Sequence, residues 1–198
     1  MNAWDRNLVL WRLAAAVLLL TLVSGCVTKR PLPPYPSDWP AIIRQGCDCS
    51  AISGTYADNG IEADANGSRT VKSLSRLLEV EEPNKVQDVI IRLGAIGEDG
   101  AGEMVIAAMC DGTVVKTRTL GYSCVNGEAV AVDHTSSGNL YLFMMWFENT
   151  TKSFTTANDG SLVIKSVYNS GGLVLLVPVW TDTTKLFRFE RIPAAPVK

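Results

Sequence analysis

The fold is decided by residues 103–133, EMVIAAMCDGTVVKTRTLGYSCVNGEAVAVD. This stretch contains three runs of strand-forming residues, at 103–110, 113–120 and 128–133. Turn residues divide the runs, Asp111-Gly112 at the first boundary and Asn126-Gly127 before the third run. Because Asp-Gly and Asn-Gly pairs readily supply the positive φ angles of tight hairpin turns, the stretch predicts consecutive antiparallel strands.

The same pattern continues through the rest of the chain. Further strand-type segments lie at 86–93, 139–148, 152–157, 161–168, 173–180 and 184–192, with turn residues at Ser137-Gly138-Asn139, Asp159-Gly160 and Ser170-Gly171-Gly172. Phe187 and Phe189 alternate with charged residues, which indicates one buried and one solvated face. Residues 140–147 are apolar at every position, so we expect both faces of that strand to be covered. These hairpins predict a mainly β domain, a single antiparallel meander closed as a small barrel or folded as a curled sheet or sandwich, with the barrel favoured.

One short helix is expected before the strands. Thr70 can cap it, and Pro83 can end it. Val71, Leu74, Leu77 and Leu78 follow one another at helical spacing. The spacing predicts a helix over 70–81. One face of the strand 140–147 could lie under this helix, line a ligand cavity or form an interface.

The N-terminal residues resemble a bacterial lipoprotein signal. Arg6 and Arg12 precede an uncharged apolar run from 13 to 23, too short to cross a bilayer comfortably. Val23-Ser24-Gly25-Cys26 then resembles a lipobox, in which small residues precede the modified cysteine.

The resemblance implies a signal peptide at 1–25 and a diacylglycerol thioether on Cys26. It also implies acylation of the new amino terminus, for example with palmitate, so that Cys26 becomes the first residue of the mature protein. Val27 stands where aspartate favours inner-membrane retention, so we expect an outer-membrane lipoprotein facing the periplasm.

Residues 26–45 are expected to join the lipid to a globular domain at 46–198. The five prolines between 31 and 40 favour extended chain. We expect a tether at 27–37, followed by a strap in which Trp39, Ile42 and Ile43 dock on the domain.

The remaining cysteines predict disulfides, because they are even in number and the expected compartment is oxidising. They are Cys47, Cys49, Cys110 and Cys124. One hypothesis links each member of the first pair to the second pair. The competing hypothesis is a Cys110–Cys124 bridge across neighbouring strands. A zinc site is disfavoured by the one-residue spacing of Cys47 and Cys49.

Residues 49–56, Cys-Ser-Ala-Ile-Ser-Gly-Thr-Tyr, resemble the opening of a group of small uncharacterised bacterial lipoproteins. That resemblance extends loosely over the mature domain and implies no activity. Gly54-Thr55-Tyr56 is also similar to the Gly-x-Trp start of lipocalins, with Tyr56 in place of the tryptophan. The second resemblance implies a ligand-binding barrel.

Charge and motifs indicate neither an enzyme nor a nucleic-acid binder. The whole chain has 18 basic and 20 acidic side chains, so it lacks a basic footprint for nucleic acid. His134 is the only histidine and falls in an expected turn. Three further stretches were compared with known site motifs and do not match them. Residues 62–67 do not complete a calcium loop, residues 94–102 do not form a phosphate loop, and Glu81-Glu82 does not form a catalytic carboxylate pair. We therefore expect no catalytic residues, metal or cofactor.

Two functions remain as expectations. The first is a non-enzymatic interaction or structural module of the cell envelope, attached to the membrane by its lipid and binding an envelope protein. The alternative is a lipocalin-like carrier of a lipid or another small apolar ligand.

Overall fold

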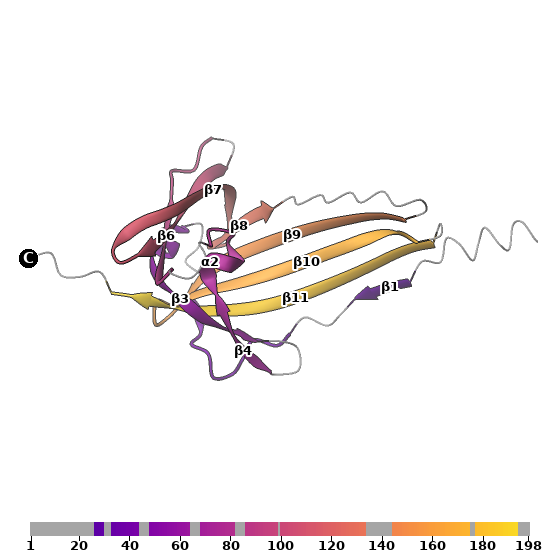
Figure 1. The fold of residues 1–198 in the computed structure, drawn as a ribbon, viewed down its shortest axis with the longest axis horizontal. Coiled ribbons are helices and arrows are strands. Elements are labelled where there is room, and N and C mark those ends of the chain that lie inside the picture. Colours follow the sequence, from indigo (N-terminus) through magenta and orange to yellow (C-terminus); the bar gives the residue numbers. More distant parts are fainter. Residues whose placement is uncertain are drawn as a thin grey trace, which may run out of the picture. The chain divides into compact units, whose positions relative to one another are not determined.

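The computed structural model describes residues 26–29, 33–43, 48–63, 68–81, 86–98, 100–133, 144–174 and 177–193. The described chain is almost entirely β. Its elements, in order, are β1 (Cys26–Lys29), β2 (Ile42–Ile43), η1 (Ser50–Ile52), β3 (Gly54–Ala63), β4 (Arg69–Ser73), α2 (Leu74–Leu77), β5 (Asp88–Leu93), β6 (Ala101–Cys110), β7 (Thr113–Val125), β8 (Glu128–Asp133), β9 (Met144–Ala157), β10 (Leu162–Val174) and β11 (Val177–Ile192) (Figure 1). The predicted mainly β class with one short helix is confirmed.

The residues divide into two compact units that share the long strands β9, β10 and β11. The barrel unit comprises Pro31–Asp133, Thr150–Val167 and Thr184–Lys198. The ribbon unit comprises Met1–Arg30, His134–Asn149 and Tyr168–Thr183.

The strands of the barrel unit close into a ring. Neighbours pair in the order β11-β10-β9-β8-β7-β6-β5-β3, and β3 pairs back with β11, where Leu186 lies opposite Ala63 and Phe189 opposite Gly60. Consecutive strands from β5 to β9 pair antiparallel, as hairpins require. The meander is therefore a small closed barrel, the favoured form of the prediction.

Hairpin turns stand where the sequence places them. Asp111 and Gly112 have φ angles of 49° and 74°, and Asn126 and Gly127 have 52° and 77°. Two consecutive positive φ angles are the signature of a type I′ turn. In contrast, Ser170-Gly171-Gly172 is not a turn but lies inside β10. The predicted segments 139–148 and 152–157 share one strand, β9, in their described part.

The barrel interior is filled by apolar side chains from every strand of the ring. The core cluster includes Tyr56, Val89, Ile91, Met104, Ile106, Ala108, Tyr122, Ala129, Ala131, Phe154, Leu162, Ile164, Phe187 and Phe189, with Leu74 and Leu78 from α2 and the residue after it. A barrel of about eight strands is just wide enough for side chains to fill. Side chains of this core occupy the space where a carrier's enclosed cavity would lie.

The predicted helix over 70–81 is mostly wrong. Residues 69–73 pair with 59–63 of β3 as the strand β4, and only Leu74–Leu77 are helical. Ser73, not Thr70, is the N-cap, and its hydroxyl accepts a hydrogen bond from the Arg76 N–H at 3.1 Å. Val71 is 74% exposed, whereas Leu74 and Leu78 are fully buried. Thr70 and Val71 are β-branched and therefore favour the strand β4, so the helix starts only after them.

The strap is confirmed, and it starts earlier than predicted. Trp39 is buried in a second apolar cluster with Ala63, Ala157, Val163 and Leu186, and β2 pairs with the end of β9. Pro33 is buried, and the Tyr35 ring meets the Trp39 ring edge-on with centroids 5.8 Å apart. Residues 33–37 therefore belong to the strap and not to a free tether.

Candidate functional site

The expected lipidation residue, Cys26, is the first residue of β1. This strand pairs in parallel with β11, with Cys26 opposite Val179 and Lys29 opposite Asp182 (Figure 1). Cys26 therefore lies level with the first described residues of β11. From Cys26 to Lys29 the chain runs in the same direction as β11 from Val179 to Asp182.

That start of β11 is strongly apolar. Residues 173–174, Leu-Val, end β10, and residues 177–180, Val-Pro-Val-Trp, begin β11. Trp180 is 50% exposed. Its indole lies against Gly171, where an added Cβ would come within 2.0 Å of the ring. Gly171 is thus needed for close approach of the indole, which explains why Ser-Gly-Gly stands inside a strand.

Polar side chains flank the apolar residues of β10 and β11 along these strands. Asp182 follows Trp180 by two positions on β11. A hydrogen bond to Glu148 raises the pKa of the Tyr168 hydroxyl to about 12, so Tyr168 remains a proton donor at neutral pH. Glu148, Tyr168 and Asp182 all belong to the ribbon unit.

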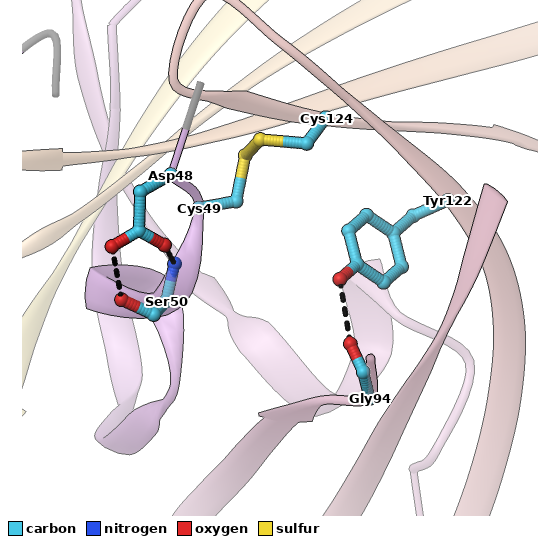
Figure 2. The surroundings of a disulfide bond; sticks show 6 residues. All are labelled: Asp48, Cys49, Ser50, Gly94, Tyr122 and Cys124. Atoms are coloured by element: carbon cyan, nitrogen blue, oxygen red, sulfur yellow. Dashed lines mark hydrogen bonds between the residues drawn. A yellow bond between two sulfur atoms is a disulfide. The ribbon is translucent and has the colours of Figure 1, made fainter. Parts of the chain in front are cut away.

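The disulfide of the barrel unit joins Cys49 to Cys124, with Cα atoms 6.1 Å apart (Figure 2). It ties the segment before η1 to the end of β7, as the first hypothesis predicts for one of its two bridges. The competing Cys110–Cys124 bridge is wrong, because Cys124 is bonded to Cys49. Cys47 lies outside the described residues, and a bridge from it to Cys110 stays a prediction.

A shallow pocket of about 280 Å³ lies beside this disulfide. Hydrogen bonds from the Ser50 N–H and hydroxyl, both 2.8 Å, lower the pKa of Asp48 (Figure 2). On the pocket wall, the Tyr122 hydroxyl donates to the Gly94 carbonyl at 2.9 Å. These contacts keep Asp48 a carboxylate and hold Tyr122 in place, and they provide no acid–base pair.

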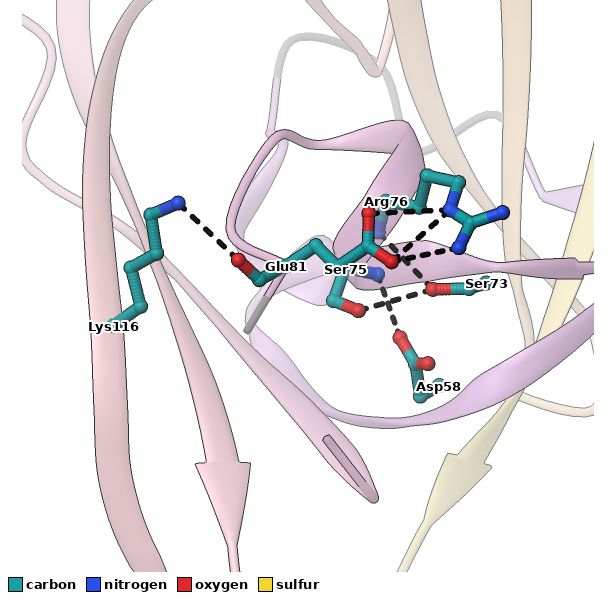
Figure 3. Close-up of polar contacts among 6 residues, drawn as sticks. All are labelled: Asp58, Ser73, Ser75, Arg76, Glu81 and Lys116. Carbon is teal, nitrogen blue, oxygen red and sulfur yellow. Dashed lines mark hydrogen bonds and ion pairs between the residues drawn. The ribbon is translucent and has the colours of Figure 1, made fainter. Parts of the chain in front are cut away.

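A polar network holds α2 against the barrel strands (Figure 3). The Ser75 N–H donates to the buried Asp58 carboxylate at 2.6 Å. Arg76 forms an ion pair with Glu81 at 2.7 Å, and Lys116 donates to the Glu81 carbonyl at 3.3 Å. Glu81 therefore has a structural role, and Glu82 lies outside the described residues.

Glu62 also serves structure. Its carboxylate lies 2.8 Å from the Lys185 ammonium and 3.1 Å from that of Lys72, and Thr70 donates to it. Burial by itself raises the pKa of Glu62, but the hydrogen bonds from the two lysines outweigh this effect and lower it. Sequence reasoning missed this cluster, since Glu62 and Lys185 come together only through the β3–β11 pairing.

The other residues considered from the sequence form no site in the described part of the chain. His134 and residues 64–67 lie outside the described residues. Among those described, no group of three histidine, cysteine, aspartate or glutamate residues could hold a metal ion. The described helices include none with the length and apolar character needed to cross a membrane.

Comparisons with protein families, curated proteins and solved structures gave no match to this chain.

Proposed function

We propose that this protein is a lipoprotein of the bacterial cell envelope that serves as a non-enzymatic interaction or structural module. In this proposal Cys26 carries the lipid, and the barrel faces the periplasm from the outer membrane. The observation that carries the proposal is Val23-Ser24-Gly25-Cys26 following an uncharged apolar run.

The contacts of the acidic residues support a non-enzymatic role. Asp58 binds the helix backbone, and Glu62 is held by two lysines. Asp159 forms an ion pair with Arg188 at 2.7 Å and accepts from Ser161. Each of these carboxylates stabilises the barrel, so none of the three is left poised for acid–base work.

The anchor can be tested by metabolic labelling. The full chain is expressed in a Gram-negative bacterium that is fed an alkyne analogue of palmitate. We expect label on the wild-type protein and its loss in Cys26→Ser, whereas the matched variant Cys110→Ser keeps the label. Absence of label from the wild type, or label on Cys26→Ser, would contradict the proposal.

The interaction role needs a separate experiment. Photocrosslinkable residues at exposed positions of the barrel unit, such as Val114 and Val132, are activated in intact cells. We expect discrete adducts with an envelope protein. If every position yields only the uncrosslinked monomer, the module hypothesis is wrong even where the lipid anchor is present.

A further inference from the structure

We propose that the start of β11 and the end of β10 insert into the membrane leaflet that holds the acyl chains of Cys26. The inserting residues, called the apolar end, are 173–174 of β10 and 177–180 of β11. This inference rests on the proposed lipidation of Cys26 and adds a second, non-covalent membrane contact to it.

The sequence around the apolar end carries no charge. From Asn169 to Thr181 there is no acidic or basic residue, and the same holds for 139–147, which lead into and begin β9. The first charged residue after the apolar end is Asp182. A stretch of this kind can enter hydrocarbon without burying an unpaired charge.

The register of β1 against β11 is the reason for choosing lipid as the environment of the apolar end. Cys26 lies opposite Val179, inside the apolar end, and Lys29 lies opposite the charged Asp182. Lipid chains attached to Cys26 therefore start at the level of the apolar residues. Because the pairing is parallel, the chain then runs from Cys26 to Lys29, which lies opposite the charged Asp182.

The length of the apolar end limits how deeply it can enter. From Val177 to Trp180 a strand rises roughly 10 Å, whereas the hydrocarbon core of a bilayer is about 30 Å thick. A described segment of this length fits within one leaflet. This depth matches a protein whose lipid also occupies one leaflet.

Trp180 and the strand edge also suit a membrane surface. Trp180 is half exposed and held against Gly171, and tryptophan is enriched at membrane–water interfaces. The backbone of β11 is paired with β1 over Val179–Asp182. This pairing satisfies backbone groups of β11, and β1 becomes the edge strand of the sheet there.

A tethered-vesicle experiment tests the inference without depending on lipidation. In a Cys26→Ser chain, residues 1–25 are replaced by a hexahistidine tag, which binds vesicles of phosphatidylethanolamine and phosphatidylglycerol doped with a nickel-chelating lipid. Lipids brominated on their acyl chains then quench any tryptophan that enters the leaflet. We expect quenching of the tethered protein and loss of the quenched fraction in Trp180→Phe.

The test variant is Val179→Asp, and the matched control is Val114→Asp, which makes the same change at a 49% exposed valine of the barrel unit. We expect Val179→Asp to lower the inserted fraction about tenfold, because aspartate is strongly disfavoured at membrane depth. Val114→Asp should quench like the parent. If Val179→Asp does not fold, as judged by circular dichroism, Val179→Thr serves in its place and should show a smaller loss.

Two outcomes would overturn the inference: no quenching of the tethered parent, or equal quenching in Val179→Asp. If there is no quenching and the parent self-associates in solution while Val179→Asp does not, the apolar end belongs to a contact with a second copy of the chain. Failure of palmitate labelling with positive quenching would instead refute the lipid anchor alone.

Discussion

Opening the Cys49–Cys124 disulfide is expected to cost this protein a large part of its stability. The bridge joins residues separated by 75 positions. On chain-entropy grounds, releasing a loop of that length stabilises the unfolded state by about 4.5 kcal/mol at 25 °C. Cys49 is also buried in the core, so its replacement by alanine leaves a small void that adds about 1 kcal/mol.

The double variant Cys49→Ala/Cys124→Ala should therefore lose about 4–6 kcal/mol in its free energy of unfolding. Whole domains have about 5–15 kcal/mol, so the variant is expected to be marginal. The assay is urea denaturation of residues 26–198 carrying Cys26→Ser, followed by circular dichroism. With a slope of about 2 kcal/mol per M, the midpoint should fall by roughly 2–3 M.

Reduction of the parent protein provides the control. A phosphine reductant should move the parent's midpoint toward that of the double variant. The reasoning would be refuted if the double variant unfolded within about 1 kcal/mol of the oxidised parent, because the entropy of closing a loop this long predicts a much larger difference.

Three further predictions concern the barrel unit. Gly60→Ala should destabilise by about 1–3 kcal/mol in urea denaturation, because the new Cβ would lie 2.2 Å from the Phe189 ring, whereas Gly121→Ala, with nothing within 4 Å, should change stability little. Trp39→Ala should cost about 3–5 kcal/mol and make the strap susceptible to limited proteolysis; an intact strap would contradict its docking. Because the pKa of Glu62 is lowered in the folded state, its contribution is present at neutral pH and is lost as the pH falls through that lowered pKa. The stability advantage of the parent over Glu62→Gln should therefore shrink on acidification, and an advantage independent of pH would refute this assignment.

Local chemistry in the sequence was enough to predict the middle of the barrel. Asp111-Gly112 and Asn126-Gly127 have few conformations open to them other than a tight turn, so the β6–β7 and β7–β8 connections could be located. The alternation around Phe187 and Phe189 likewise identified a buried face, and both side chains are in the core.

The sequence misled where a tertiary contact decides the conformation. The predicted strand segments did not include β3, which passes through Asp58-Asn59-Gly60. Asp58 binds the α2 backbone there, and Gly60 makes room for Phe189. Gly171 looked like a turn residue because its contact with Trp180 cannot be read from either residue alone. The residues before Cys26 were enough to propose it as the lipidation residue, but its position opposite Val179 depends on a strand register that no local pattern specifies.

The pairing of β3 with β11 also constrains how the chain can fold. Arg191, at the end of β11, donates hydrogen bonds to the carbonyls of Ala51 and Ser53, which are 140 and 138 residues away. Contacts between such distant residues form slowly, because the entropy of closing the loop must be lost before they contribute. A chain that folds as it emerges from the ribosome would have one edge of β3 unpaired until β11 is made. During that interval the exposed edge of β3 is available to other strands, so the folding chain should be more prone to pairing with other chains than its size suggests.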